Sequence, residues 1–348
     1  MYELTVVLPT YNEAGNLPAL VHRIERLGLN SEIIVVDDGS KDGTAEVARA
    51  LMNEYGNIKL IEREGKQGID TAVRDAAAVA SADYIAVMDS DLQHPPEMLP
   101  VMLGEARSGK DIVVASRYVT GSANRMGLMR RLVSRAATSA VHFLVPQAKN
   151  IRDPLSGFFL FYRKAVSLEE ATHGSYKILL EIIARNRVSA VEVPFSFGER
   201  YSGKSKLGLT EMIRFASLTF RLSDYRAAKF ITVGLVGIAI NEGILFMLEP
   251  HAPLLLASAV AVEASIVSNF IMNNTWTFRR KAKVGFFRGL VKYNFVTIVG
   301  GIINILILGM LVFAHFEYLA ANFIGTLFGF AANYLGSEGI VWHVRLPN

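Results

Sequence analysis

The chain has 348 residues, 51% of them hydrophobic, and a formal net charge of +4. This length is enough for two domains, and the absence of cysteine excludes disulfides. The first 228 residues contain 28 Lys or Arg and 27 Asp or Glu, whereas the last 120 contain eight and five. We therefore expect a nearly neutral soluble part followed by an apolar membrane part, and no nucleic acid as a partner.

The amino-terminal part alternates short β-rich runs with helical patterns. Strands are expected at residues 4–8, 32–36, 58–61, 84–88 and 112–115, and helices near 17–27, 44–54, 68–80 and 97–108. This alternation predicts an α/β domain with a mainly parallel sheet. The first apolar run is too short for a signal peptide and lacks a basic flank, so we expect this domain in the cytoplasm.

Polar clusters follow three of these strands, at residues 9–13, 37–40 and 89–91. Ligands of such sheets bind beyond the carboxyl ends of the strands. Asp89 and Asp91 are two residues apart in an extended segment, so they point the same way and would repel each other without a cation. A solvated turn would explain one such pair, but three clusters at one edge favour a site. Oxygen ligands of this kind suit Mg²⁺ or Mn²⁺.

Neither of the familiar glycine-rich phosphate loops is present: the chain lacks both G-x-G-x-x-G and G-x-x-x-x-G-K-[ST]. This absence disfavours a hydride-transfer enzyme and a P-loop enzyme. What remains is a nucleotide site whose diphosphate is held through a metal.

Four apolar segments of the carboxyl-terminal part, near 230–248, 254–272, 293–313 and 319–341, have about the length that crosses a bilayer. Lys and Arg lie before the first segment, between the second and third, and after the fourth, whereas the other two connectors have none. The positive-inside rule therefore predicts a multi-pass protein with four spans and both termini in the cytoplasm. The alternative is a buried helical bundle of a soluble protein.

The same part of the chain repeats itself. Residues 229–241 align with 292–304 at an offset of 63, and Asn269 aligns with Asn333 at an offset of 64. The repeat predicts a duplicated two-helix hairpin. Polar residues within the spans are expected at helix interfaces or in a polar cavity, with packing favoured over a transport path; they are Asn241, Glu242, Glu263, Asn269, Asn304 and Asn333.

Two further helical patterns are amphipathic, at about 125–144 and 207–222. The first carries Arg130, Arg131 and Arg135, and such helices lie in membrane interfaces; the alternative is packing against the soluble domain. We therefore expect a catalytic domain at 1–206 that includes the first helix, an interface helix and linker at 207–228, and a membrane domain at 229–348.

These segments carry a family resemblance. Val6-Val-Leu-Pro-Thr-Tyr-Asn-Glu13, Val35-Val-Asp-Asp-Gly-Ser40 and Asp89-Ser-Asp-Leu-Gln-His-Pro-Pro-Glu97 resemble the signatures of inverting family-2 glycosyltransferases with the GT-A fold. More narrowly, residues 1–228 are similar to the polyprenyl-phosphate sugar synthases, above all the dolichol-phosphate mannose synthases. Arg117-Tyr118, Asp153-Pro-Leu-Ser-Gly157 and the segment 193–208 extend the match. The four spans resemble the GtrA-like membrane domain fused to some of these synthases.

The resemblance implies roles for individual residues. The nucleotide sugar would be bound by Pro9, Tyr11, Glu13, Val36, Asp38, Asp89, Asp91, Gln93, Arg200 and Lys204. Asp89, Asp91 and Gln93 would hold Mg²⁺ or Mn²⁺. The acceptor phosphate would be bound by Arg117, Arg131 and Ser134, and the catalytic residues would be Asp91, Arg117, Arg131 and Arg200. The family usually has a Gly-rich Asn/Lys-x-Gly-x-Gly segment near residue 65, which here reads Gly65-Lys-Gln-Gly68-Ile-Asp70.

The reaction that the resemblance implies is transfer of mannose from GDP-mannose to dolichyl phosphate with inversion. A homo-oligomer through the membrane domain is compatible with it. UDP-glucose with dolichyl or undecaprenyl phosphate is the nearest alternative, and a lipid-linked sugar flippase is an alternative of another class, which the retained Asp89 and Asp91 disfavour. A processive polysaccharide synthase would be expected to carry Gln-x-x-Arg-Trp, which is absent.

Overall fold

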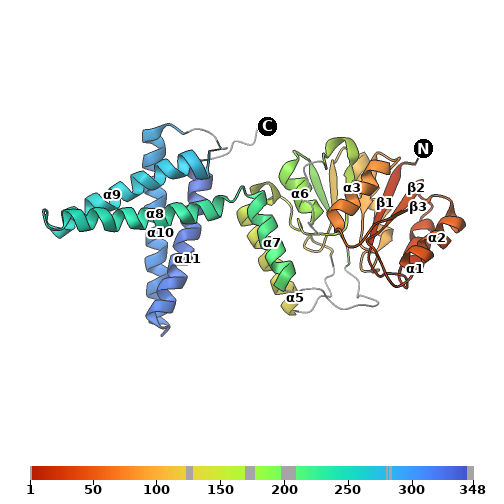
Figure 1. The fold of residues 1–348 in the computed structure, drawn as a ribbon, viewed down its shortest axis with the longest axis horizontal. Helices are drawn as coiled ribbons and strands as arrows, with labels where there is room; N and C mark the ends of the chain where they lie inside the picture. The colour runs from red at the N-terminus through yellow and green to blue at the C-terminus, as the bar shows by residue number, and fades with distance from the viewer. Residues whose placement is uncertain are drawn as a thin grey trace. The chain divides into compact units, whose positions relative to one another are not determined.

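The computed structural model describes residues 2–122, 128–168, 177–196, 209–279, 281 and 284–342. The chain divides into two compact units, Met1–Leu222 and Ser223–Asn348. Figure 1 shows the first as a sheet with helices on both faces and the second as helices alone.

The first unit is built on a seven-stranded sheet of described residues, in the order β3-β2-β1-β4-β6-β5-β7. Its strands are β1 (Leu4–Thr10), β2 (Ser31–Asp37), β3 (Ile58–Glu62), β4 (Tyr84–Val87), β5 (Ile112–Ser116), β6 (Phe159–Tyr162) and β7 (Ala190–Pro194). Only β6 runs antiparallel to its neighbours, β4 and β5. The expected α/β domain with a mainly parallel sheet is confirmed.

Both faces of this sheet are buried under helices. The helices are α1 (Leu17–Glu25), α2 (Thr44–Tyr55), α3 (Ile69–Val79), α4 (Leu99–Arg107), α5 (Leu128–Leu144), α6 (Ile178–Arg185) and α7 (Leu209–Leu222). Val6 of β1 faces the core formed with α1, α2 and α4, whereas Val7 faces the core formed with α3 and α6. This alternation follows from the two-residue period of a strand. Because β1 pairs in parallel with both β2 and β4, the carboxyl ends of these three strands share one edge of the sheet.

The two amphipathic helices, α5 and α7, both belong to the first unit. Val141 of α5 is buried in the core beside α3 and α6, and Phe215 and Leu222 of α7 pack against the same core. The side of α5 that faces away from this core is exposed at Arg135, Ala136 and Ser139. Packing against the domain therefore accounts for one face of α5 and leaves another face accessible.

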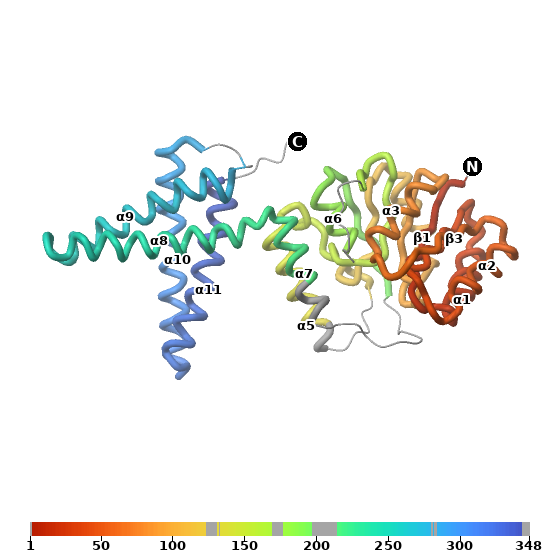
Figure 2. Tube along the Cα trace, viewed as in Figure 1, coloured from red at the N-terminus to blue at the C-terminus, as the bar shows by residue number. Residues whose placement is uncertain are grey.

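The second unit consists of two helical hairpins. The first joins α8 (Arg226–Leu248) to α9 (Leu254–Met272), and the second joins α10 (Phe286–Phe313) to α11 (Tyr318–Gly336). Figure 2 traces α8, α9, α10 and α11 along the chain. Short π-helices, η4 (Asn273–Thr277) and η5 (Ser337–Val341), extend α9 and α11. Among the described residues, three helical segments are long and apolar enough to cross a membrane: Arg226–Leu248, Leu254–Thr277 and Phe286–Phe313.

Corresponding contacts occur in both hairpins. A Cβ atom on Gly237 of α8 would overlap the Asn269 side chain, and one on Gly300 of α10 would overlap the Asn333 side chain. Close approach of the second pair of helices also depends on Gly329, where a Cβ would lie 2.9 Å from the Gly300 carbonyl oxygen. Small residues at membrane helix contacts let backbones approach in this way.

The hairpins meet through aromatic rings and a buried ion cluster. Phe230 of α8 packs edge-on against Tyr334 of α11, with ring centroids 5.6 Å apart. The Glu338 carboxylate lies 2.9 Å from an Arg226 guanidinium nitrogen and 2.7 Å from Lys281 Nζ. All three side chains are nearly buried, so this cluster fixes the start of α8, the segment after η4, and η5 relative to one another.

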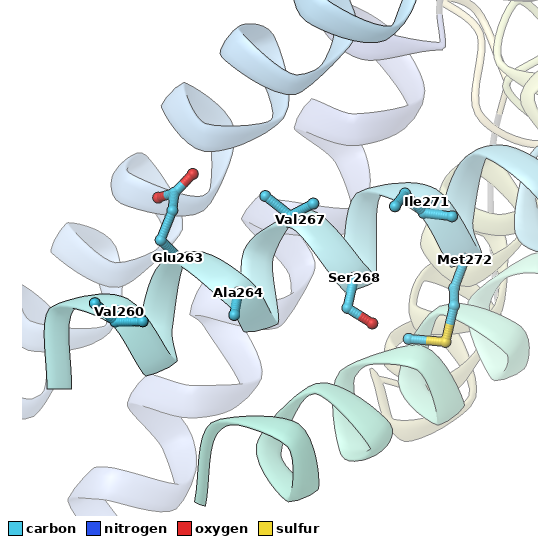
Figure 3. A pocket seen from close by; sticks show the side chains of 7 residues that line it. All are labelled: Val260, Glu263, Ala264, Val267, Ser268, Ile271 and Met272. Carbon is cyan, nitrogen blue, oxygen red and sulfur yellow. The ribbon is translucent and has the colours of Figure 1, made fainter. Parts of the chain in front are cut away.

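One groove of about 590 Å³ runs along α9 and is mostly apolar. Among the seven side chains that Figure 3 labels, Glu263 is the ionisable one. Its Oε1 accepts a 3.4 Å hydrogen bond from Asn294 Nδ2 of α10. This contact agrees with the expected packing role of polar residues within the spans.

Candidate active site

A cavity of about 200 Å³ lies at the carboxyl end of β4. Four of the predicted site residues line it together: Asp89, Asp91, Gln93 and Arg117. Further lining residues come from the segment before β6, from the first residue of β6 and from the start of α6: Leu155, Ser156, Gly157, Phe159, Lys177 and Ile178. The edge that the strand pattern indicated therefore contains a polar cavity.

The turn after β4 places three oxygen-bearing side chains along this cavity. Asp91 and Gln93 are buried, whereas the Asp89 side chain is about half exposed. Leu92 has a φ of 63°, a left-handed conformation that is rare for leucine. The resulting turn brings the Gln93 N–H to 3.2 Å from Asp91 Oδ1. Strained backbone of this kind is often found at ligand sites.

His94 packs against the same turn and holds it by a hydrogen bond. Its Nδ1 accepts a 3.0 Å hydrogen bond from the Asp89 N–H, and its ring stacks on Phe158 at 5.3 Å. Burial lowers the pKa of His94, against the opposing effect of the Asp89 carboxylate. A neutral imidazole with Nδ1 as acceptor fits this hydrogen bond, so His94 orients Asp89.

The residues at this turn fit a divalent cation. Asp89 and Asp91 offer carboxylate oxygens and Gln93 an amide oxygen, and oxygen ligands are those that Mg²⁺ and Mn²⁺ prefer. Space is kept at Asp89 because Gly157 has no side chain: a Cβ there would lie 3.0 Å from Asp89 Oδ2. Across the part of the chain that the structure describes, no group of three His, Cys, Asp or Glu residues could hold a metal. Gln93 and substrate oxygens would have to complete the coordination.

Arg117 is held in a fixed orientation by a buried carboxylate. Its Nε and Nη2 donate to the two oxygens of Asp153 at 2.8 and 2.7 Å, and its backbone N–H donates to the same group at 3.0 Å. Burial lowers the pKa of Arg117, but the hydrogen bonds and charge of Asp153 outweigh it, and the pKa is raised. The guanidinium is therefore charged, and two of its donors are already engaged.

Ser134 is linked to this region through Tyr118. The Tyr118 hydroxyl lies 2.7 Å from the Ser134 Oγ, which joins the end of β5 to α5. Arg131 lies one turn earlier on α5 and shares that face of the helix. Neither Ser134 nor Arg131 lines the cavity at β4.

The residues expected at the nucleoside lie at the ends of β1 and β2 and do not line this cavity. Asp38 has well-defined partners: its carboxylate accepts hydrogen bonds from the Gln67 and Gly68 N–H groups at 2.8 and 3.0 Å. Arg63 Nη1 lies 3.0 Å from the same carboxylate. Asp38 thus holds residues 63–68 in place through hydrogen bonds and an ion pair. This is the segment in which the glycine pattern differs from that of the family.

That segment packs closely on the loop after β2. Gly39 and Gly65 both have a φ of 76°, and a Cβ on Gly39 would lie 2.8 Å from the Gly65 Cα. Only glycine fits this approach. The packing brings Lys66 Nζ to 4.9 Å from the centre of the Tyr11 ring, so a cation lies over one of the predicted nucleotide-binding residues.

The comparisons with known proteins agree with this architecture. Residues 5–167 match the family described as glycosyl transferase family 2, and residues 229–342 match the GtrA/DPMS transmembrane domain. The dolichol-phosphate mannosyltransferase of Pyrococcus furiosus is 37% identical over 98% of this chain and 99% of its own length. The chain belongs to the dolichol-phosphate mannosyltransferase family.

Two eukaryotic members of the family match a smaller share of the chain. The dolichol-phosphate mannosyltransferase of Mycosarcoma maydis is 33% identical over 68% of this chain and 83% of its own, and that of Saccharomyces cerevisiae is 31% identical over 61% and 84%. A solved mannosyltransferase, PcManGT from Pyrobaculum calidifontis in complex with GDP-Man and Mn²⁺, aligns over 97% of this chain and 88% of its own. Because its TM-score is 0.42 and its sequence identity is 16%, this structure is too distant to add to these assignments.

Family membership makes the chain a glycosyltransferase with a membrane domain, as the sequence predicted. Arg200 and Lys204, expected to close over the donor, lie outside the described residues. Lys177 lines the cavity but was missed, because no motif marks it. Gly157 belongs to a segment that matches the family, but the sequence does not indicate its role. That role depends on its contact with Asp89, which is distant in the sequence.

Proposed function

We propose that this glycosyltransferase moves mannose from GDP-mannose to dolichyl phosphate with inversion, giving dolichyl β-D-mannosyl phosphate. The supporting observation is the cavity at β4, where Asp89, Asp91 and Gln93 are lined up with the charged Arg117. Oxygen ligands for a diphosphate-bound cation and a guanidinium for a phosphate are what such a transfer requires. The full-length similarity to a protein named for this activity supports the same substrates.

The leaving group is the demanding part of the reaction. Asp91 and Gln93, with Asp89 beside them, would hold Mg²⁺ or Mn²⁺ against the donor diphosphate. The bound cation would act as a Lewis acid that neutralises the charge on departing GDP. His94 keeps Asp89 in position through the Asp89 N–H. Arg200 and Lys204 would close over the diphosphate from the segment before α7.

The nucleophile needs alignment more than activation. A lipid monophosphate is already an anion at neutral pH, so no side chain has to remove a proton from it. Arg117, Arg131 and Ser134 would align this phosphate behind the sugar. Because Asp153 fixes the Arg117 guanidinium, that charge is preorganised and needs little rearrangement during the reaction.

The nucleoside would bind beside the cavity, at the ends of β1 and β2. Pro9, Tyr11, Glu13 and Val36 would line its site. Asp38 would keep the 63–68 segment against it, through the Gln67 and Gly68 N–H groups. Lys66 over Tyr11 would add positive charge near the diphosphate.

The lipid acceptor explains the membrane domain. We infer four spans with the catalytic domain and both termini in the cytoplasm, because the Lys and Arg residues of the connectors lie on one side. The fourth span would be α11, which lies against α10. The exposed face of α5 would lie in the interface, where Arg135 meets anionic headgroups.

A donor panel tests the proposal. Purified protein in detergent would be given dolichyl phosphate with GDP-mannose or UDP-glucose, and with Mg²⁺, Mn²⁺ or a chelator. We expect mannosyl transfer that the chelator abolishes and a much lower rate with UDP-glucose. A preference for UDP-glucose would reassign the donor, and transfer with neither donor would refute the proposed function.

A further inference from the structure

We propose that Lys177 binds the phosphate of the lipid acceptor; this assignment rests on the proposed function and adds a residue to its site. Lys177 lines the cavity at β4 together with Asp91, Gln93 and Arg117. Its Nζ donates a 3.1 Å hydrogen bond to the Leu155 carbonyl oxygen, which also belongs to the cavity wall. The ammonium is thus placed at the wall of the cavity, where a phosphate that enters the cavity would meet it.

The state of Arg117 creates the need for a second cation. Arg117 donates twice to Asp153, a carboxylate with no exposed surface. Much of its charge and two of its guanidinium donors are therefore already committed. The cation that Asp89 and Asp91 would hold balances these two carboxylates, but the diphosphate of the donor adds two further negative charges to the cavity. A lipid phosphate entering such a site would be repelled unless another positive group lies close to its path.

The start of α6 adds to the positive potential. Lys177 is the residue that precedes this eight-residue helix, and within the described residues no side chain caps it. Lysine is an unfavourable choice there, because its charge adds to the positive end of the helix dipole, whereas Ser, Thr, Asn and Asp are the usual caps. The buried Glu181 in the first turn of α6 already offsets part of the helix dipole, and a bound phosphate would offset the charge of Lys177 itself. The local cost of this lysine is explained if the position binds an anion.

The position of Lys177 favours the acceptor phosphate over the donor diphosphate. The oxygen ligands for the donor's cation lie on the turn after β4, whereas Lys177 belongs to the start of α6. Its neighbours in the cavity wall include Leu155 and Ile178, and this apolar surface suits the prenyl end of a lipid phosphate. In-line displacement puts nucleophile and leaving group on opposite sides of the sugar, so separate groups should bind them.

Substitution with separate readouts for the two substrates tests this assignment. Lys177→Gln and Lys177→Arg would be compared with the wild type in the full-length protein. Lys164→Gln is the matched control, because Lys164 is exposed and pairs with Asp83. The measurements are kcat, KM for dolichyl phosphate, and the Kd of GDP-mannose with Mn²⁺. Thermal unfolding in detergent would establish that each variant is folded.

We expect Lys177→Gln to raise KM for dolichyl phosphate by about tenfold or more, the size of a lost charge-assisted hydrogen bond. The Kd of GDP-mannose should stay within about twofold of wild type, because that ligand makes no such contact. Lys177→Arg should recover part of the acceptor affinity, and Lys164→Gln should behave as wild type. A weakened Kd for GDP-mannose, or an unchanged KM for the lipid in folded Lys177→Gln, would overturn the assignment. An inactive wild type would instead refute the proposed function.

Discussion

The two units of the chain bury polar side chains for different purposes. In the catalytic unit, Asp89, Asp91 and Gln93 gather at one sheet edge and face a cavity, where a substrate reaches them. In the membrane unit, Asn269 and Asn333 lie against Gly237 and Gly300 in two equivalent helix contacts. Polar groups that converge on open space indicate chemistry, whereas polar groups repeated at matching helix contacts indicate packing. Substitutions should separate these roles.

The largest effect is expected at the cavity. Asp91→Asn keeps the size of the side chain but removes the charge that would hold the cation. We expect transfer of mannose to fall by roughly a thousandfold or more, with thermal stability near that of the wild type. Asp83→Asn, at an exposed ion pair with Lys164, should leave the rate unchanged. Substantial turnover by folded Asp91→Asn would show that this carboxylate does not serve the reaction.

In the membrane unit, the loss of a buried carboxylate should lower the thermal stability of the protein. Glu338→Gln would leave the nearly buried Arg226 and Lys281 without their shared carboxylate. Breaking one side of a buried ion cluster costs about 3 kcal/mol or more, so the thermal midpoint in detergent should fall clearly. The matched variant Glu249→Gln, at an exposed position, should unfold like the wild type. Equal thermal midpoints for the two variants would show that the ion cluster does not stabilise this unit.

A smaller loss should follow from filling a helix contact. Gly329→Ala would place a Cβ 2.9 Å from the Gly300 carbonyl oxygen, a backbone atom that cannot move freely. Overpacking of this kind costs about 1–3 kcal/mol. Gly301→Ala is the control, because nothing lies within 4 Å of its Cβ. If the two alanine variants melted at the same temperature, α10 and α11 would not be packed as described.

A further effect concerns pH, at the sheet edge opposite the cavity. Burial raises the pKa of Glu32, but the Lys59 ammonium and hydrogen bonds from Ser81 and Thr5 outweigh it and lower the pKa from 4.5 to about 2. Because the folded value is the lower one, Glu32 stabilises the protein above pH 4.5, and this contribution is lost as pH falls towards 2. The stability difference between wild type and Glu32→Gln should therefore shrink over that window. A difference that is constant from pH 5 to 2.5 would contradict the shift.

The pattern of apolar residues in the sequence was sufficient to predict much of the fold. The continuous apolar runs of β1 and β2 indicated strands that are covered on both faces, and helices do cover both faces of the sheet. By contrast, β6 and β7 lie beyond the part in which strands were expected, and the antiparallel direction of β6 follows from pairing with β4. Gly325 and Gly329 form a G-x-x-x-G spacing, which is a local sequence signal for a close helix contact.

Prediction of the site depended on whether its partners are close in sequence. Asp89 and Asp91 are neighbours on one strand end, so their convergence was readable. The pairing of Arg117 with Asp153 joins residues 36 positions apart, and that of Asp38 with Gln67 spans 29. Neither partnership has a local pattern, so the sequence could not show that these two charges are already engaged. Lys177 has no motif at all, and only the fold brings it to the cavity.

The anomeric configuration of the product tests the central claim most directly. Direct attack of a lipid phosphate on the donor, without a covalent enzyme intermediate, inverts the sugar carbon. The product formed from GDP-α-D-mannose and dolichyl phosphate would be analysed by NMR of its mannosyl phosphate. We expect the β anomer alone. An α-linked product would contradict a single in-line displacement in the cavity at β4.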